Sequence, residues 1–173
     1  NKSLQSEVPG EFNLAENLSS AEVFRSQKTE TLPADSLLNH GFEAALSGDI
    51  SKAIAAYDQI ISKYSDKSAA TKAYLNKGII QYNSGGFGES IESFKAVINR
   101  NTERDVLEEK AYWYMGNAYI NIEQPEKARE AIHKVYSMDG IYRKPSFRLL
   151  KKLDYKLGNV DFDNFEDQIK EGE

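Results

Sequence analysis

The side chains best suited to chemistry are few and lie far apart in the sequence. His40 and His133 are the only histidines, and neither has a second ligand at metal-binding spacing, which predicts structural roles for both. The chain has no cysteine, so disulfides, thiolate metal sites and cysteine nucleophiles are excluded. The carboxylates are spread over the predicted helix faces, and no Ser/His/Asp grouping follows from their spacing.

Two short segments resemble ligand loops, and both fail on a required residue. Residues 83–88 (Asn-Ser-Gly-Gly-Phe-Gly) lack the Gly-Lys-Ser/Thr ending of a phosphate-binding loop, which favours a turn between helices. Residues 161–167 are acidic like a calcium loop, but the fifth position is Phe165 and no glycine follows it. No catalytic, cofactor-binding or metal-binding residue is therefore predicted, and we do not expect an enzyme.

Composition narrows the class of protein. The chain has 173 residues with 40% apolar side chains, a net charge of −5 and a pI near 5.2, which is typical of one globular domain and argues against a nucleic-acid binder. No apolar run approaches the length of a membrane span. The chain starts at Asn1 without a methionine, so we expect an upstream segment such as a signal peptide or membrane anchor.

The elements that must position these residues are helices. Residues 1–33 are polar and predict an extended arm with at most a short helix near residues 15–24. From Asp35 the apolar side chains recur at helical spacing, with breaks at Gly48-Asp49, Gly85-Gly86 and Gln124-Pro125. Pro125 suits the first position of a helix, and Gly140 suits the left-handed position after one.

Pro145 is expected to open a seventh helix that ends at Gly158. Residues 159–173 form an acidic tail, in which Phe162, Phe165 and Ile169 are spaced for one more short helix.

A repeat underlies this pattern. Gly41, Gly78 and Gly116 lie inside first helices, 37 and 38 residues apart, although glycine costs a helix about 1 kcal/mol against alanine. A small residue follows each glycine at +12 (Ala53, Ser90, Ala128), and a large one follows at +16 (Tyr57, Phe94, Ile132). We expect the glycine to face the small residue, so that the two helix backbones approach closely, and the large residue to fill the space between successive pairs.

The residues from Ala111 to Tyr119, followed by Ala128 and Ile132, resemble a tetratricopeptide repeat. The segments around Gly41 to Tyr57 and Gly78 to Phe94 resemble two more. The resemblance implies a right-handed all-α superhelix over residues 34–158, with units near 34–67, 71–104 and 109–142 and a capping helix over 143–158. Longer loops, Ser90 in place of alanine and Pro125 in place of an aromatic residue depart from the family pattern. The third unit also looks similar to that of tetratricopeptide proteins from Bacteroidetes.

The resemblance further implies a concave groove, lined by the first helices, that binds an extended peptide. The candidate residues are apolar or aromatic side chains with asparagines between them, because amides can pair with a peptide backbone. They are Leu38, Asn39, Phe42, Leu75, Asn76, Ile79, Tyr82, Lys110, Trp113, Tyr114, Asn117, Ile120 and Asn121. Only Asn76 and Lys110 match the five-residue carboxylate clamp of chaperone-binding relatives, so a more apolar ligand is implied. The alternative is that neighbouring units or the arm bury these side chains.

The predicted function is a protein-binding scaffold, in the soluble part of a bacterial cell-envelope protein, with a protein or peptide partner and no nucleic acid or cofactor. A periplasmic or membrane-anchored location is favoured over the cytoplasm. The alternative is a self-assembling solenoid whose arm fills its own or a neighbour's groove, which leaves a monomer and an arm-mediated oligomer both open. The seventh helix is basic in this acidic chain, which indicates either a solvated cap or an edge for an acidic partner or anionic membrane.

Overall fold

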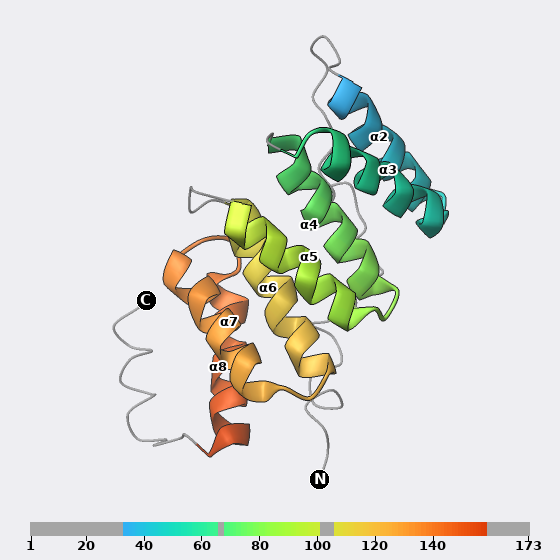
Figure 1. Ribbon diagram of the computed structural model, residues 1–173. Helices are drawn as coiled ribbons and strands as arrows, with labels where there is room; N and C mark the ends of the chain where they lie inside the picture. The colour runs from blue at the N-terminus through green and yellow to red at the C-terminus, as the bar shows by residue number, and fades with distance from the viewer. Residues whose placement is uncertain (1–32, 66–67, 101–105, 159–173) are drawn as a thin grey trace.

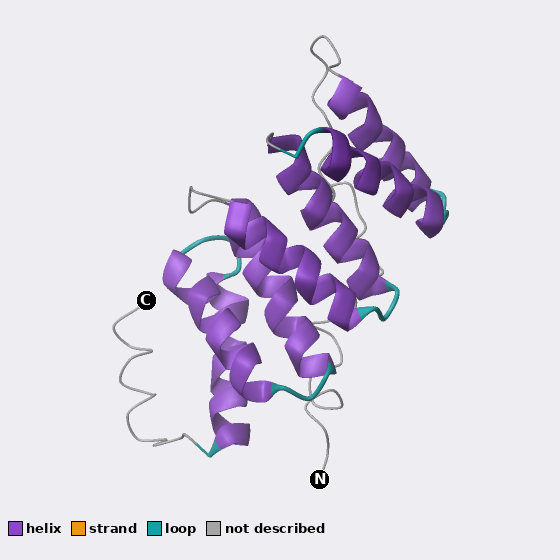
Figure 2. Ribbon diagram, in the orientation of Figure 1, coloured by secondary structure: helices purple, strands orange, loops and turns teal. Residues whose placement is uncertain are grey.

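Seven α-helices make up the part of the chain that the computed structural model describes, residues 33–65, 68–100 and 106–158. They are α2 (Pro33–Leu46), α3 (Ile50–Lys63), α4 (Ser68–Asn83), α5 (Phe87–Arg100), α6 (Val106–Asn121), α7 (Pro125–Met138) and α8 (Arg143–Leu157). Consecutive helices pack together, and the pairs step diagonally from α2 and α3 to α7 and α8 (Figures 1 and 2). The predicted all-α solenoid is confirmed. The arm, the acidic tail and the two short helices expected in them lie outside the described residues.

The three helix pairs turn in the same way. The residue that follows the first helix by two positions has a positive φ in each pair: Gly48 (80°), Gly85 (82°) and Glu123 (58°). Its N–H donates to the carbonyl three residues back at 3.0–3.1 Å, and the next N–H donates to the carbonyl five residues back at 2.8–2.9 Å. In the third pair the sequence pattern placed the break at Gln124-Pro125, but Glu123 adopts the left-handed conformation. Pro125 opens α7 as predicted.

The glycines of the first helices allow close approach, but to a different residue from the one expected. A Cβ on Gly41 or Gly78 would lie 2.6 Å from a ring carbon of Tyr57 or Phe94, and one on Gly116 would lie 2.5 Å from Ile132 Cδ1. The large side chain at +16 therefore lies directly over the glycine of its own pair. The small residues at +12 are fully buried, but they are not the atoms nearest to the missing Cβ.

Burial divides the helices into two kinds. Ten of the 16 residues are buried in α4 and in α6, whereas only four or five of 14 are buried in α3, α5 and α7. The first helices α4 and α6 are therefore enclosed on most sides, and the second helices keep one face towards solvent. The buried apolar residues form two clusters, one reaching from α2 to α4 and the other from α4 to α8.

A buried carboxylate ties α6 to the turn before α8. Glu109 is 3% exposed, and its carboxylate accepts hydrogen bonds from the backbone N–H of Tyr142 at 2.8 Å and of Ile141 at 3.2 Å. A Cβ on Gly140 would collide with this carboxylate. The left-handed residue after α7 is Asp139 rather than the predicted Gly140, so Gly140 serves to make room for Glu109. The helix α8 begins at Arg143, two residues before the expected Pro145, and ends at the left-handed Gly158.

Candidate functional site

The predicted groove residues come from α2, α4 and α6, and the structure buries most of them. Eleven of the thirteen are 7% exposed or less, and only Asn39 and Asn121 are half-buried. The eleven are Leu38, Phe42, Leu75, Asn76, Ile79, Tyr82, Lys110, Trp113, Tyr114, Asn117 and Ile120. Their assignment as peptide contacts stays a prediction, because burial alone does not tell a packing residue from a ligand-binding one.

Two of the predicted contacts have clear packing roles. The ring of Tyr114 stacks on Phe94, with centroids 5.8 Å apart, and meets the edge of Tyr82 at 5.9 Å. Tyr114 therefore joins the second and third helix pairs. Trp113 stacks on Tyr142 with centroids 5.1 Å apart and an interplanar angle of 12°, which ties α6 to the residue just before α8. These contacts between units depend on tertiary packing and could not be read from helical spacing.

On α6, Gly116 faces α7 and Tyr114 faces α5, and a further stripe of side chains on this helix faces neither. At the repeat spacing, the same positions recur in α2 and α4. We call these residues the inner stripe. Its members are Asp35, Leu38, Phe42, Leu46, Lys72, Leu75, Ile79, Asn83, Lys110, Trp113, Asn117 and Asn121.

Asparagines on the inner stripe form a short ladder of hydrogen bonds in the third unit. Asn117 Nδ2 donates to the carbonyl of Trp113 at 2.7 Å. Asn121 Nδ2 donates to the carbonyl of Asn117 at 2.9 Å and to the hydroxyl of Tyr82 at 3.0 Å. Burial raises the pKa of Tyr82 to about 12, and the hydrogen bond from Asn121 opposes that rise. The Asn121 amide thus links two units through a hydroxyl that stays protonated.

Asn83 occupies the position of Asn121 in the second unit, but its amide is not used in the same way. Both Asn83 Nδ2 and Oδ1 are buried, and neither has a hydrogen-bond partner among the described residues. The residue equivalent to Tyr82 in the first unit is Ala45, so the hydroxyl that accepts from Asn121 has no counterpart for Asn83. Asn83 was absent from the predicted set, although its equivalence to Asn121 in the repeat register was a usable signal.

A comparison with models of protein families gives one match near each end of the described region. Models described as tetratricopeptide repeat match residues 34–67 and residues 109–142. The chain belongs to the tetratricopeptide repeat family. The middle pair, α4 and α5, has the same turn hydrogen bonds and the same glycine contact as its two matched neighbours, so it is a third unit of the same kind. A comparison with curated proteins gives no match.

Membership of the tetratricopeptide repeat family indicates a general function. Such repeats generally mediate protein–protein interactions, and proteins built from them are typically scaffolds rather than enzymes. Within residues 33–65, 68–100 and 106–158, no group of three His, Cys, Asp or Glu side chains could hold a metal ion. In the same ranges, no helix is long and apolar enough to cross a membrane.

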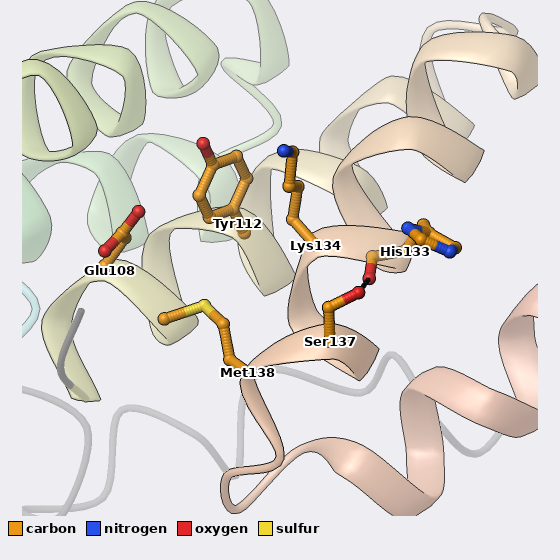
Figure 3. A pocket seen from close by; sticks show the side chains of 6 residues that line it. All are labelled: Glu108, Tyr112, His133, Lys134, Ser137 and Met138. Carbon is orange, nitrogen blue, oxygen red and sulfur yellow. Dashed lines mark hydrogen bonds between the residues drawn. The ribbon is translucent and has the colours of Figure 1, made fainter.

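One cavity of about 150 Å³ lies between α6 and α7, and its residues do not form a catalytic arrangement. It is lined by Glu108, Tyr112, His133, Lys134, Ser137 and Met138 (Figure 3). The hydroxyl of Ser137 donates to the main-chain carbonyl of His133 at 2.8 Å, and the imidazole ring points away from the other side chains (Figure 3). A serine nucleophile would need the ring nitrogen as its base, so this pair does not supply one.

Proposed function

We propose that this tetratricopeptide repeat protein holds an extended peptide or a partner protein along the inner stripe, and that it is not an enzyme. The stripe combines large apolar side chains (Leu75, Ile79 and Trp113) with the amides of Asn83, Asn117 and Asn121. Leu75 and Ile79 are fully buried, so the exposed part of Trp113 supplies the apolar contact area to a ligand, and the amides donate to and accept from its backbone. The charged members of the stripe are two lysines, Lys72 and Lys110, and one aspartate, Asp35, so the stripe favours a mostly apolar ligand over a carboxylate held by several cations.

The amide of Asn83, which has no hydrogen-bond partner among the described residues, is the observation that carries this proposal. A buried amide without partners costs about 1–3 kcal/mol for each unsatisfied group, so a partner that restores both hydrogen bonds gains that energy on binding. One residue of an extended peptide offers a backbone N–H and a backbone carbonyl, which match Asn83 Oδ1 and Nδ2. Asn117 Oδ1, which is also buried and has no partner in the described part of the chain, gives a second acceptor on the same stripe one unit away.

A phage-displayed library of random peptides, selected against the wild-type chain, tests the proposal. We expect selected peptides to bind the Asn83→Ala variant about thirtyfold more weakly, because two hydrogen bonds of about 1 kcal/mol each are lost. Asn99→Ala, at an exposed position on the outer helix α5, is the matched control and should bind like the wild type. Selected peptides that bind wild-type and Asn83→Ala chains equally would refute the assignment of the inner stripe.

The second candidate function is a solenoid whose own arm, residues 1–32, fills the inner stripe. Leu38, Phe42, Leu75 and Ile79 are 1% exposed or less, which supports an occupant that belongs to this chain. The arm contains apolar residues able to pack on such a stripe, namely Phe12, Leu14, Leu18, Val23 and Phe24. A synthetic peptide of residues 1–32 should then bind a variant that lacks the arm and should not bind the full chain.

Light scattering separates the two forms of arm docking. An arm inserted into a neighbour gives an oligomer that becomes monomeric when residues 1–32 are removed, whereas an arm docked on its own chain gives a monomer in both cases. If the arm peptide fails to bind a folded, arm-deleted variant, the second candidate function is wrong and an external partner is left. A role at the bacterial cell envelope is part of the proposal and is tested by locating the full gene product in cell fractions.

A further inference from the structure

The inner stripe carries opposite charges in its first two units. Asp35 of α2 and Lys72 of α4 stand at the same position of the repeat, and both side chains are half-buried. Among the described residues, neither side chain takes part in an ion pair or a hydrogen bond. The residue at that position in the third unit, Lys110, is only 4% exposed. Asp35 and Lys72 are therefore the two charges that the stripe can present to a ligand.

These two charges restrict the kind of ligand that can cover the first two units. Water solvates a half-buried charge while the stripe is open, but a ligand that lies over the stripe displaces this water. A wholly apolar ligand would leave both Asp35 and Lys72 without solvent and without a partner, which is costly. A ligand avoids this cost if it places a cation at Asp35 and an anion at Lys72.

The distance between the two positions suits an extended peptide. The helices α2 and α4 pack against each other, and the axes of packed helices lie about 8–10 Å apart. Equivalent positions on the two helices are separated by a similar distance. A peptide in the polyproline II conformation has three residues per turn and rises about 3.1 Å per residue, so side chains i and i+3 lie on one side, about 9 Å apart. Such a pair can reach Asp35 and Lys72 together.

We propose that the ligand of the inner stripe is a peptide with one basic and one acidic side chain about three residues apart, and that Asp35 and Lys72 fix the direction in which it binds. This inference rests on the proposed function. The amide of Asn83 can pair with a peptide backbone that runs in either direction, so it does not select one. A peptide bound in reverse places like charges together at both Asp35 and Lys72, and the repulsion rejects that direction.

Selection on a charge-swapped chain tests the direction. Random peptides displayed on phage are selected in parallel on the wild-type full chain and on the variant Asp35→Lys, Lys72→Asp, which has the same net charge. The order of the basic and the acidic residue in peptides from the wild type should be reversed in peptides from the swapped chain.

Affinities measured on individual peptides extend this test. A peptide selected on the wild type should bind the swapped chain about tenfold more weakly, since two attractive pairs become repulsive. Exchanging the two charged residues of that peptide should restore its affinity for the swapped chain. The difference should shrink at 1 M salt, where the Debye length falls to about 3 Å.

Two further variants serve as controls. The variant Glu130→Lys, Lys134→Glu exchanges two exposed charges on the outer helix α7 and should select peptides with the same charge order as the wild type. The neutral variant Asp35→Asn, Lys72→Gln should bind peptides of both orders equally. Circular dichroism confirms that each variant is folded.

The outcomes separate this inference from the proposed function. Weaker binding to Asn83→Ala, together with an unchanged charge order on the swapped chain, would overturn the inference and leave the proposed function standing. Selected peptides that carry only one kind of charge would overturn it as well. A library that yields no binding peptide would overturn both.

Discussion

Replacing Gly140 with alanine should destabilise the protein through Glu109. The φ of Gly140 is not in the left-handed region, so its backbone conformation suits alanine. The added Cβ would collide with both carboxylate oxygens of Glu109, and the carboxylate must leave its place. The N–H groups of Ile141 and Tyr142 would then lose a charged acceptor, and a carboxylate that is 3% exposed would have to find another partner.

The size of the effect follows from these hydrogen bonds. A hydrogen bond to a charged group contributes about 1.5–3 kcal/mol, and partial solvation of the freed N–H groups offsets some of the loss. We therefore expect Gly140→Ala to lower the free energy of unfolding by about 2 kcal/mol. In a Glu109→Ala background no carboxylate opposes the methyl group. There the same change should raise the free energy of unfolding by about 0.5 kcal/mol, because alanine restricts the unfolded chain.

A double-mutant cycle measures this coupling. Urea unfolding, followed by far-ultraviolet circular dichroism, compares wild type, Gly140→Ala, Glu109→Ala and the double variant, and we expect a coupling energy of about 2.5 kcal/mol. Gly88→Ala is the control, because no heavy atom lies within 4 Å of its added Cβ, and it should stabilise α5 by up to about 1 kcal/mol. Effects that add to within about 0.5 kcal/mol would refute the role assigned to Glu109.

Three further predictions concern the turns, an ion pair and a buried tyrosine. Gly48→Ala should destabilise the protein by about 1 kcal/mol in thermal unfolding, and Glu123→Gly should stabilise it by a similar amount, because both positions require a positive φ. Changes in stability of the same sign for the two variants would contradict this. Asp154→Asn should cost about 1–2 kcal/mol in urea unfolding, since its side chain is 8% exposed beside Arg129, whereas Glu92→Gln, which breaks an exposed pair, should cost less than about 0.5 kcal/mol. The raised pKa of Tyr82 favours the folded state below pH 10, and this stability should be lost as the pH rises from 10 to about 12, by about 1.4 kcal/mol per pH unit. Tyr82→Phe should flatten the dependence of unfolding free energy on pH in that window, and an unchanged slope would contradict the prediction.

Helix positions and the repeat could be predicted from the sequence because they depend on local periodicity. The spacing of Gly41, Gly78 and Gly116 located three equivalent pairs, and Pro125 and Gly158 marked helix ends correctly. The prediction of which residue faces each glycine was wrong, because packing inside a pair is decided by side-chain size in three dimensions. Tyr57, Phe94 and Ile132 are large enough to reach across the pair, and the small residues at +12 are not.

The turn of the third pair and the role of Gly140 show a second limit. Sequence rules assign positive φ to glycine, but here Glu123 and Asp139 adopt it, and the nearby Gly140 does not. The surrounding hydrogen bonds impose the conformation on Glu123, as they do on Gly48 and Gly85. Only the position of the Glu109 carboxylate explains the glycine at 140.

Candidate site residues were harder to predict than the fold. Helical spacing showed which residues belong to first helices, but it could not show that Tyr114 packs between Phe94 and Tyr82. The amide of Asn83 differs from that of Asn121 in having no hydroxyl to donate to, because Ala45 stands at the position equivalent to Tyr82. Such a feature becomes visible only when equivalent residues are compared unit by unit in space.

The division of the core into two clusters has a consequence for how the protein opens. The helix α4 contributes to both clusters, and helices more than two apart in the chain share few contacts. The pair α2 and α3 can therefore detach while α4 to α8 keep their own core, so thermal fluctuations should expose this end first. In hydrogen exchange the amides of α2 and α3 would gain deuterium earlier than those of α6. The solenoid would then open from the end formed by α2 and α3, and α4 would mark the boundary of the opened part.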